Sequence, residues 1–83
     1  MSSDTFIRVR RIIASYLGTP EEAVAEESRL QDLGVDSLSA LELIFLMEEE
    51  FGVSVPDHRV ADFTTVRDVC AGIEALRAPV GPR

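Results

Sequence analysis

The sequence predicts an all-α fold, a small four-helix bundle of three main helices and one short helix, with a long ordered loop between the first and second helices. Three observations predict it: apolar residues recur at helical spacing in three segments, capping residues or glycines bound these segments, and 83 residues allow only one domain. We expect the domain to occupy residues 1–77. Residues 78–83 contain two prolines and no apolar stripe, so we expect a disordered tail there.

The first helix is expected from Asp4 to Leu17. Ser3 or Asp4 can cap its start, and Gly18 can adopt the left-handed conformation that ends a helix. The recurring apolar side chains, which predict the face toward the core, are Phe6, Val9, Ile12, Ile13, Tyr16 and Leu17.

Residues 19–35 are expected to form an ordered loop. Pro20 follows a capping threonine and precedes two acids, which predicts a single short helical turn. Val24, Leu30 and Leu33 are spaced to hold the loop against the core. Loops of this length inside a compact domain are usually functional.

The second main helix is expected from Ser37 to Phe51, between a cap at Asp36 and a stop at Gly52. On a helical wheel its apolar residues form two groups on nearly opposite sides. The first face, which we assign to the core, consists of Ala40, Leu43, Ile44, Met47 and Phe51. The second face consists of Leu38, Leu41 and Phe45. Because a small bundle buries one such face well and hardly both, the second face is either a docking surface or a strip that the loop of residues 19–35 covers.

Two further helices are expected after an extended link over residues 53–56. Asp57 can start a brief helical turn that ends near residue 61. The last helix is expected from Thr65, whose hydroxyl can cap the helix start. The side chain of Asp68, three residues later, can accept a hydrogen bond from the Thr65 N–H in return. Its single apolar stripe consists of Val66, Val69, Ile73 and Leu76.

Acidic residues are concentrated in the middle of the chain. The formal net charge is -7, and residues 26–62 hold ten acids against two arginines. Three of these acids flank the second face: Glu42, Glu48 and Glu49. Such a field repels nucleic acid and anionic membranes and attracts basic protein surfaces, so we expect protein partners and neither nucleic acid nor membrane binding. No targeting segment opens the sequence and no apolar run is long enough to span a bilayer, so we expect a cytoplasmic protein.

A candidate site opens the second helix. Gly34 permits a tight turn, and Asp36 as the cap fixes Ser37 in the first helical turn with its hydroxyl outward. A phosphate ester on Ser37 would lie beside free N–H groups and the positive end of the helix dipole. From these residues alone a plain helix start is the simpler interpretation, and a phosphodiester site is the alternative.

Five segments, spread along the chain, decide between these interpretations. They are Leu-Gly-Val-Asp-Ser-Leu at 33–38, Leu-Glu-Leu at 41–43, Glu-Glu-Glu-Phe-Gly-Val at 48–53, Val-Pro-Asp at 55–57 and Thr-Thr-Val at 64–66. In their order and spacing they resemble the acyl carrier proteins of fatty acid and polyketide synthesis. This resemblance favours modification of Ser37 over a plain helix start.

The resemblance implies a cofactor and partners. A separate phosphopantetheinyl transferase would move 4'-phosphopantetheine from coenzyme A onto Ser37, with Asp36 and Gly34 forming the attachment site. The thiol of that arm would carry acyl or polyketide intermediates as thioesters. The partners would be an acyltransferase, a ketosynthase or acyl-activating enzymes with basic docking surfaces. They would bind the carrier through Leu38, Leu41, Glu42, Phe45, Glu48 and Glu49. An acyl-chain cavity would be lined by Leu43, Ile44 and Met47.

Two positions depart from the family pattern. Ser39 stands where fatty acid carriers usually have an acid, and Phe45 is bulkier than the usual residue. Both weaken the match to primary fatty acid biosynthesis. We therefore expect a discrete, monomeric carrier of polyketide or hybrid natural-product biosynthesis.

Other functions are less consistent with the sequence. The lone histidine, His58, has no evident Ser or Cys partner, and no metal-ligand or phosphate-loop spacing occurs, so we expect a carrier with no catalytic residue and no metal. Cys70 is expected in the core rather than as a reactive thiol. An aminoacyl or peptidyl carrier would use the same arm, but those carriers are usually less acidic and have a different motif before the serine. A cargo-free interaction module of the same fold is the remaining alternative.

Overall fold

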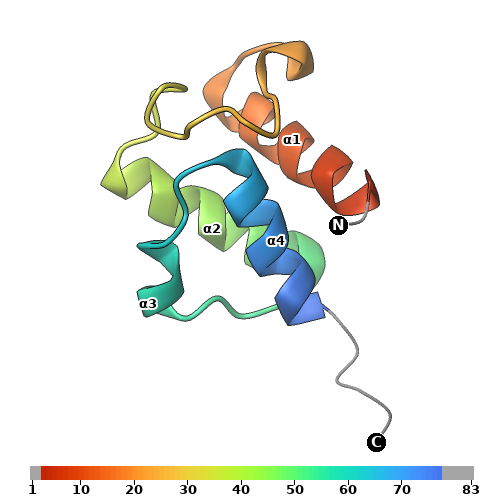
Figure 1. Cartoon of the computed structure of the whole chain (residues 1–83), viewed down its shortest axis with the longest axis vertical. Coiled ribbons are helices and arrows are strands. Elements are labelled where there is room, and N and C mark those ends of the chain that lie inside the picture. The colour runs from red at the N-terminus through yellow and green to blue at the C-terminus, as the bar shows by residue number, and fades with distance from the viewer. Residues whose placement is uncertain (1–2, 78–83) are drawn as a thin grey trace, which may run out of the picture.

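The computed structural model describes residues 3–77, and within that range it is entirely helical apart from loops and one isolated β-bridge. The elements are α1 (Ser3–Leu17), the 3₁₀ turn η1 (Glu21–Ala23), α2 (Ser37–Phe51), α3 (Asp57–Val60) and α4 (Val66–Arg77). Figure 1 shows the long loop that joins α1 to α2 and the short α3 between α2 and α4. The predicted all-α bundle is confirmed. The tail expected at 78–83 lies outside the described residues.

Helix α1 begins and ends close to its predicted bounds. It starts at Ser3, so Asp4 lies inside the first turn rather than at a cap. After its last residue, Gly18 has φ 71°, the left-handed conformation that a side chain disfavours. Thr19 then donates its backbone N–H to the carbonyl of Ala14 at 3.0 Å, which closes the helix end.

Helix α4 begins with the predicted reciprocal cap. The hydroxyl of Thr65 accepts a hydrogen bond from the Asp68 N–H at 3.2 Å, and the Asp68 carboxylate accepts one from the Thr65 N–H at 3.0 Å. These two bonds satisfy backbone donors that have no partner within the helix. They also fix the direction in which the chain enters α4.

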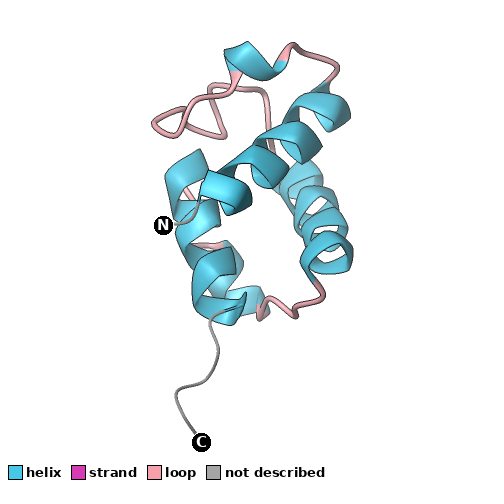
Figure 2. Ribbon diagram, turned by 90° about the vertical axis from the view of Figure 1, so that its right-hand side faces the viewer, coloured by secondary structure: helices cyan, strands magenta, loops and turns pink. Residues whose placement is uncertain are grey.

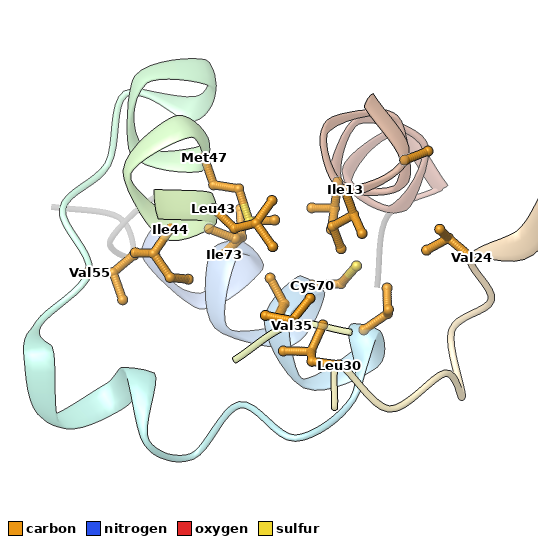
Figure 3. Close-up of a cluster of buried hydrophobic side chains, with 14 residues drawn as sticks. Ile13, Val24, Leu30, Val35, Leu43, Ile44, Met47, Val55, Cys70 and Ile73 are labelled. Atoms are coloured by element: carbon orange, nitrogen blue, oxygen red, sulfur yellow. The ribbon is translucent and has the colours of Figure 1, made fainter. Parts of the chain in front are cut away.

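The core lies between α1, α2 and α4, with α1 packed against both of the others. Figure 3 shows Ile13, Leu43, Met47 and Ile73 converging from these three helices. The predicted core faces of α2 and α4 are confirmed. Tyr16 is a correction: the sequence pattern assigned it to the core, but it lies on the surface at the edge of α1.

The loop of residues 19–35 packs on the core as predicted, through the buried side chains of Val24 and Leu30. Its backbone also pairs with the segment that leads into α4 and with the first residue of that helix. The N–H of Leu30 donates to the Thr64 carbonyl at 2.9 Å, and the N–H of Val66 donates to the Ser28 carbonyl at 2.9 Å. The loop therefore lies over α1 and the start of α4, as Figure 1 shows, and it is held there by main-chain bonds.

The end of α2 that lies away from Ser37 is fixed by charged side chains. Arg8 of α1 donates to Glu50 at 2.8 Å, and its guanidinium lies 4.5 Å from the ring centroid of Phe51. Arg77 of α4 approaches the same ring at 5.0 Å. This cluster joins three helices, α1, α2 and α4. Figure 2 shows the arrangement of the helices and of the long loop from a second side. Among the described residues no helix is both long and apolar enough to cross a bilayer.

Candidate functional site

Ser37 is the first residue of α2, and its side chain is exposed. Within residues 3–77 its hydroxyl takes part in no hydrogen bond. Gly34 has φ 93°, so the preceding turn needs a residue without a side chain. The serine hydroxyl is therefore reachable from solvent at the point where the long loop ends and α2 begins.

Asp36 holds this helix start in place. One of its carboxylate oxygens accepts a hydrogen bond from the Ser39 N–H at 2.8 Å. That backbone bond is the largest cause of a pKa below the ordinary value of 3.8 for the Asp36 carboxyl. Because folding lowers this pKa, the cap stabilises the protein above pH 3.8, and its contribution is lost as pH falls through the lower native value. At neutral pH the cap is ionised, and Ser37 stays in position.

The second face of α2 is not covered by the loop. The exposed fractions of Leu38, Leu41 and Phe45 are 68%, 53% and 68%. A contiguous apolar surface of this kind is typical of protein interaction sites. The interpretation of these residues as a buried strip is therefore wrong, and the face begins one residue after Ser37.

The three acids beside the second face have different environments. Glu42 accepts a hydrogen bond from the Tyr16 hydroxyl of α1, and this bond raises the pKa of Tyr16 above its ordinary value. Glu48 is half-buried and accepts a hydrogen bond from the Val55 N–H at 2.6 Å, which ties α2 to the link before α3. Glu49 is exposed. Glu42 and Glu48 therefore each form a hydrogen bond that holds α2 to a neighbouring segment. Their spacing along the helix did not predict these two hydrogen bonds.

A small apolar cavity lies under the first face of α2. Its volume is about 20 Å³, enough for roughly one water-sized molecule, and the predicted residues Leu43, Ile44 and Met47 all line it. Val60 and Phe63, from α3 and the turn after it, complete the wall on the other side. The sequence pattern missed these two because they belong to no periodic stripe.

Two side chains with reactive chemistry lie elsewhere. Cys70 is fully buried, as predicted, and burial raises the pKa of its thiol to about 11. His58 is exposed in the first turn of α3. Between residues 3 and 77 no three His, Cys, Asp or Glu side chains are grouped so that they could hold a metal ion.

Comparison with known proteins gives concordant matches in sequence. Residues 8–73 match a family model described as a phosphopantetheine attachment site. The chain is 43% identical over 77 residues to an acyl carrier protein of Zymomonas mobilis, covering 92% of this chain and 99% of that protein. An acyl carrier protein of Sinorhizobium fredii matches with the same identity and coverage.

Solved structures give the same result for the fold. The chain is similar to a hexanoyl-bearing acyl carrier protein of the actinorhodin polyketide synthase from Streptomyces coelicolor, with a TM-score of 0.77 and 26% identity, over 98% of this chain and 95% of that one. It is also similar to an acyl carrier protein of mupirocin biosynthesis from Pseudomonas fluorescens, with a TM-score of 0.77 and 32% identity. That match covers 96% of this chain and 76% of the other.

Proposed function

Because this chain belongs to the acyl carrier protein family, we propose that it carries intermediates of a polyketide or hybrid natural-product pathway on an arm attached to Ser37. Members of the family are carriers rather than enzymes, and their prosthetic group is covalently attached 4'-phosphopantetheine. A phosphopantetheinyl transferase and the enzymes of a synthase are the partners of such a carrier. The attachment residue, the docking face and the pathway are the parts that we propose.

The observation that carries the proposal is the free, exposed hydroxyl of Ser37 at the N-terminus of a long helix. In the attachment step the Ser37 oxygen forms a bond to the phosphorus next to the pantetheine unit of coenzyme A. The bond from that phosphorus to the bridging oxygen breaks, and adenosine 3',5'-bisphosphate leaves with the electron pair. Asp36 is a poor base for the hydroxyl proton, since its carboxylate is hydrogen-bonded and its pKa is low, so a base of the transferase takes the proton.

The N-terminus of α2 fits the phosphodiester that results. The helix dipole places partial positive charge beside Ser37, and the Ser39 N–H of the first turn is already bonded to the Asp36 carboxylate. An exposed serine also leaves the arm free to swing toward a partner. The second face begins at Leu38, so an enzyme that binds Leu38, Leu41 and Phe45 holds the arm within reach of its own active site.

Assignment to natural-product biosynthesis is supported by two side chains of α2. Phe45 projects from the end of the second face that lies away from Ser37, with 68% of its surface exposed, so a partner needs a pocket for a phenyl ring. Ser39 leaves the acidic rim weaker at the end nearest Ser37. The carriers from actinorhodin and mupirocin biosynthesis share the fold, and the latter shares 32% of its sequence.

The attachment residue is tested by mass spectrometry. The unmodified protein is incubated with coenzyme A and a broad-specificity phosphopantetheinyl transferase, and we expect one phosphopantetheine to be added. Ser37→Ala should add none. Ser39→Ala, which removes a hydroxyl half a turn away on the same helix, should still be modified. Modification of Ser37→Ala, or an unchanged wild-type mass with a competent transferase, would refute the assignment.

The pathway is tested by comparing ketosynthases. Loaded protein is offered to a ketosynthase of fatty acid synthesis and to one of discrete polyketide synthesis, and we expect faster elongation by the second. The double variant Ser39→Asp/Phe45→Met should move the preference toward the first, because it restores the acid and removes the ring. Equal rates for the wild type, with no response to the double variant, would contradict a natural-product carrier.

A further inference from the structure

Glu42, at the edge of the second face, is the acid of α2 that lies nearest to Ser37. It follows Ser37 by five residues, which corresponds to about 7.5 Å along the helix axis. Position 39 holds a serine, and the next acid of α2 after Glu42 is Glu48. The negative charge that α2 offers to a partner near the arm therefore depends on one long and exposed side chain.

This side chain is held by another helix. The hydroxyl of Tyr16, in the last turn of α1, donates a hydrogen bond to Oε1 of Glu42. Oε2 of Glu42 makes no hydrogen bond within residues 3–77, so it is open to a cation from outside. The bond to Glu42 is also the largest cause of the raised pKa of Tyr16, so the hydroxyl keeps its proton at neutral pH and remains a donor.

A second link between the same two helices differs in its electrostatic effect. Arg8 of α1 forms an ion pair with Glu50 at 2.8 Å, near the other end of α2, and so neutralises that carboxylate. Tyr16 is uncharged, so its hydroxyl restrains Glu42 without cancelling the negative charge. Glu42 is therefore both restrained and charged, and a charge of this kind attracts and orients a basic partner.

The ring of Tyr16 is a stiff support for the longer side chain of Glu42. Together with Ile12 and Leu46, it lines an open groove between α1 and α2. A tyrosine has only two side-chain torsion angles, whereas a glutamate loses more rotamer freedom when it is fixed. Because the hydroxyl already restrains Glu42 in the free protein, less freedom remains to be lost when a partner binds.

We propose that Tyr16 is a positioning residue of the docking face, whose hydroxyl holds Glu42 in the orientation in which a lysine or arginine of a partner enzyme meets it. This inference rests on the proposed function, because it requires that partners bind at the second face and its acids. It also explains why a residue that fits the apolar period of α1 lies at the surface beside α2.

The test follows attachment of the arm by a phosphopantetheinyl transferase, with the unmodified protein as the varied substrate. Tyr16→Phe removes the hydroxyl and keeps the ring. We expect KM to rise by about two- to tenfold, the factor that corresponds to ordering one long side chain on binding. The value of kcat should stay the same, because the lost interaction contributes to binding and not to the chemical step.

A double-mutant cycle shows whether Tyr16 acts through Glu42. Glu42→Ala should raise KM more than Tyr16→Phe does. Adding Tyr16→Phe to Glu42→Ala should change KM no further, because no carboxylate is left to hold. Added salt should raise KM as steeply for Tyr16→Phe as for the wild type, since Glu42 keeps its charge, and less steeply for Glu42→Ala.

Ser15→Ala is the matched control. Ser15 lines the same groove, and its hydroxyl has no hydrogen bond in the described part of the chain. Its removal should leave both KM and kcat unchanged. Circular dichroism and urea unfolding of each variant ensure that only folded proteins are compared.

The results that overturn the positioning role differ from those that overturn the proposed function. If KM is the same for the wild type and Tyr16→Phe, or if the rise in KM persists in the Glu42→Ala background, Tyr16 does not act by holding Glu42. If Glu42→Ala leaves KM unchanged, this acid does not bind the partner, and there is nothing for Tyr16 to position. A wild type that accepts no arm overturns the proposed function, and this inference with it.

Discussion

At the scale of single residues, two polar atoms with opposite surroundings decide where this protein can react. The Ser37 hydroxyl is exposed and makes no hydrogen bond among the described residues. The Cys70 thiol is fully buried in the core, where burial raises its pKa to about 11. Because the thiolate is the nucleophile, Cys70 is protected both by lack of access and by its protonation.

This contrast predicts a thiol count. At pH 8 the unmodified native protein should show no thiol that reacts with an alkylating reagent, and one after denaturation, because Cys70 is the only cysteine. The protein that bears the arm should show one reactive thiol when native and two when denatured. Alkylation followed by intact-mass measurement checks this. Rapid native labelling of Cys70 would mean that the helices open around α4 far more often than the packing indicates.

At the scale of elements, α2 has to fill the core on one side and present a surface on the other. Leu43 is 3% exposed, whereas Leu41, half a turn away, is 53% exposed. The same truncation at the two positions therefore separates the two roles of one helix.

Leu43→Ala should lower the free energy of unfolding by about 2–5 kcal/mol, because it leaves a cavity beside Met47 and Ile13. Leu41→Ala should change it by less than about 0.5 kcal/mol, since that side chain is already largely in water. Urea unfolding followed by circular dichroism measures both. Because Leu41 belongs to the proposed docking face, Leu41→Ala should instead lower the rate at which the transferase attaches phosphopantetheine to Ser37. A large loss of stability from Leu41→Ala would show that the second face is packed in solution.

At the scale of the whole molecule, the charge is unbalanced. Residues 26–62 carry ten acids and two arginines, and the whole chain has a net charge of -7. The ion pairs between segments that are distant in sequence, such as Arg8–Glu50 and Arg67–Glu26, lie at the surface and contribute little. Self-repulsion among the acids is therefore the dominant long-range electrostatic effect, and it opposes folding.

Salt should stabilise the protein for this reason. Raising sodium chloride from about 10 mM to about 150 mM shortens the Debye length from about 30 Å to about 8 Å and should raise the Tm. Glu49→Lys, within the acidic segment, should raise the Tm at low salt and reduce the response to salt. Glu22→Lys, outside that segment, is the matched control and should do less. Differential scanning calorimetry measures the shifts, and a Tm that falls with added salt would show that the ion pairs outweigh the repulsion.

The sequence by itself determined the helices and the site that opens the second one. Caps and stops such as Asp36, Thr65 and Gly52 act through neighbouring backbone groups, so their effect can be predicted from a few adjacent residues. The two faces of α2 followed from helical periodicity, and the burial of Leu43 with the exposure of Phe45 confirmed their assignment. The position of Ser37 at the start of α2 followed from the cap beside it, whereas its proposed role as the attachment residue came from the resemblance to acyl carrier proteins.

Only the tertiary structure decided which long-range partners these residues meet. Tyr16 fits the apolar period of α1 and nevertheless lies at the surface, because α2 brings Glu42 to its hydroxyl. Phe63 lies in a turn with no period at all, and its position against Gly72 depends on how α4 packs. Helical patterns arise from contacts three or four residues apart, whereas these contacts join residues that are 26 and 9 positions apart. Such pairings depend on how whole helices pack together, so they cannot be predicted from residues that are close in sequence.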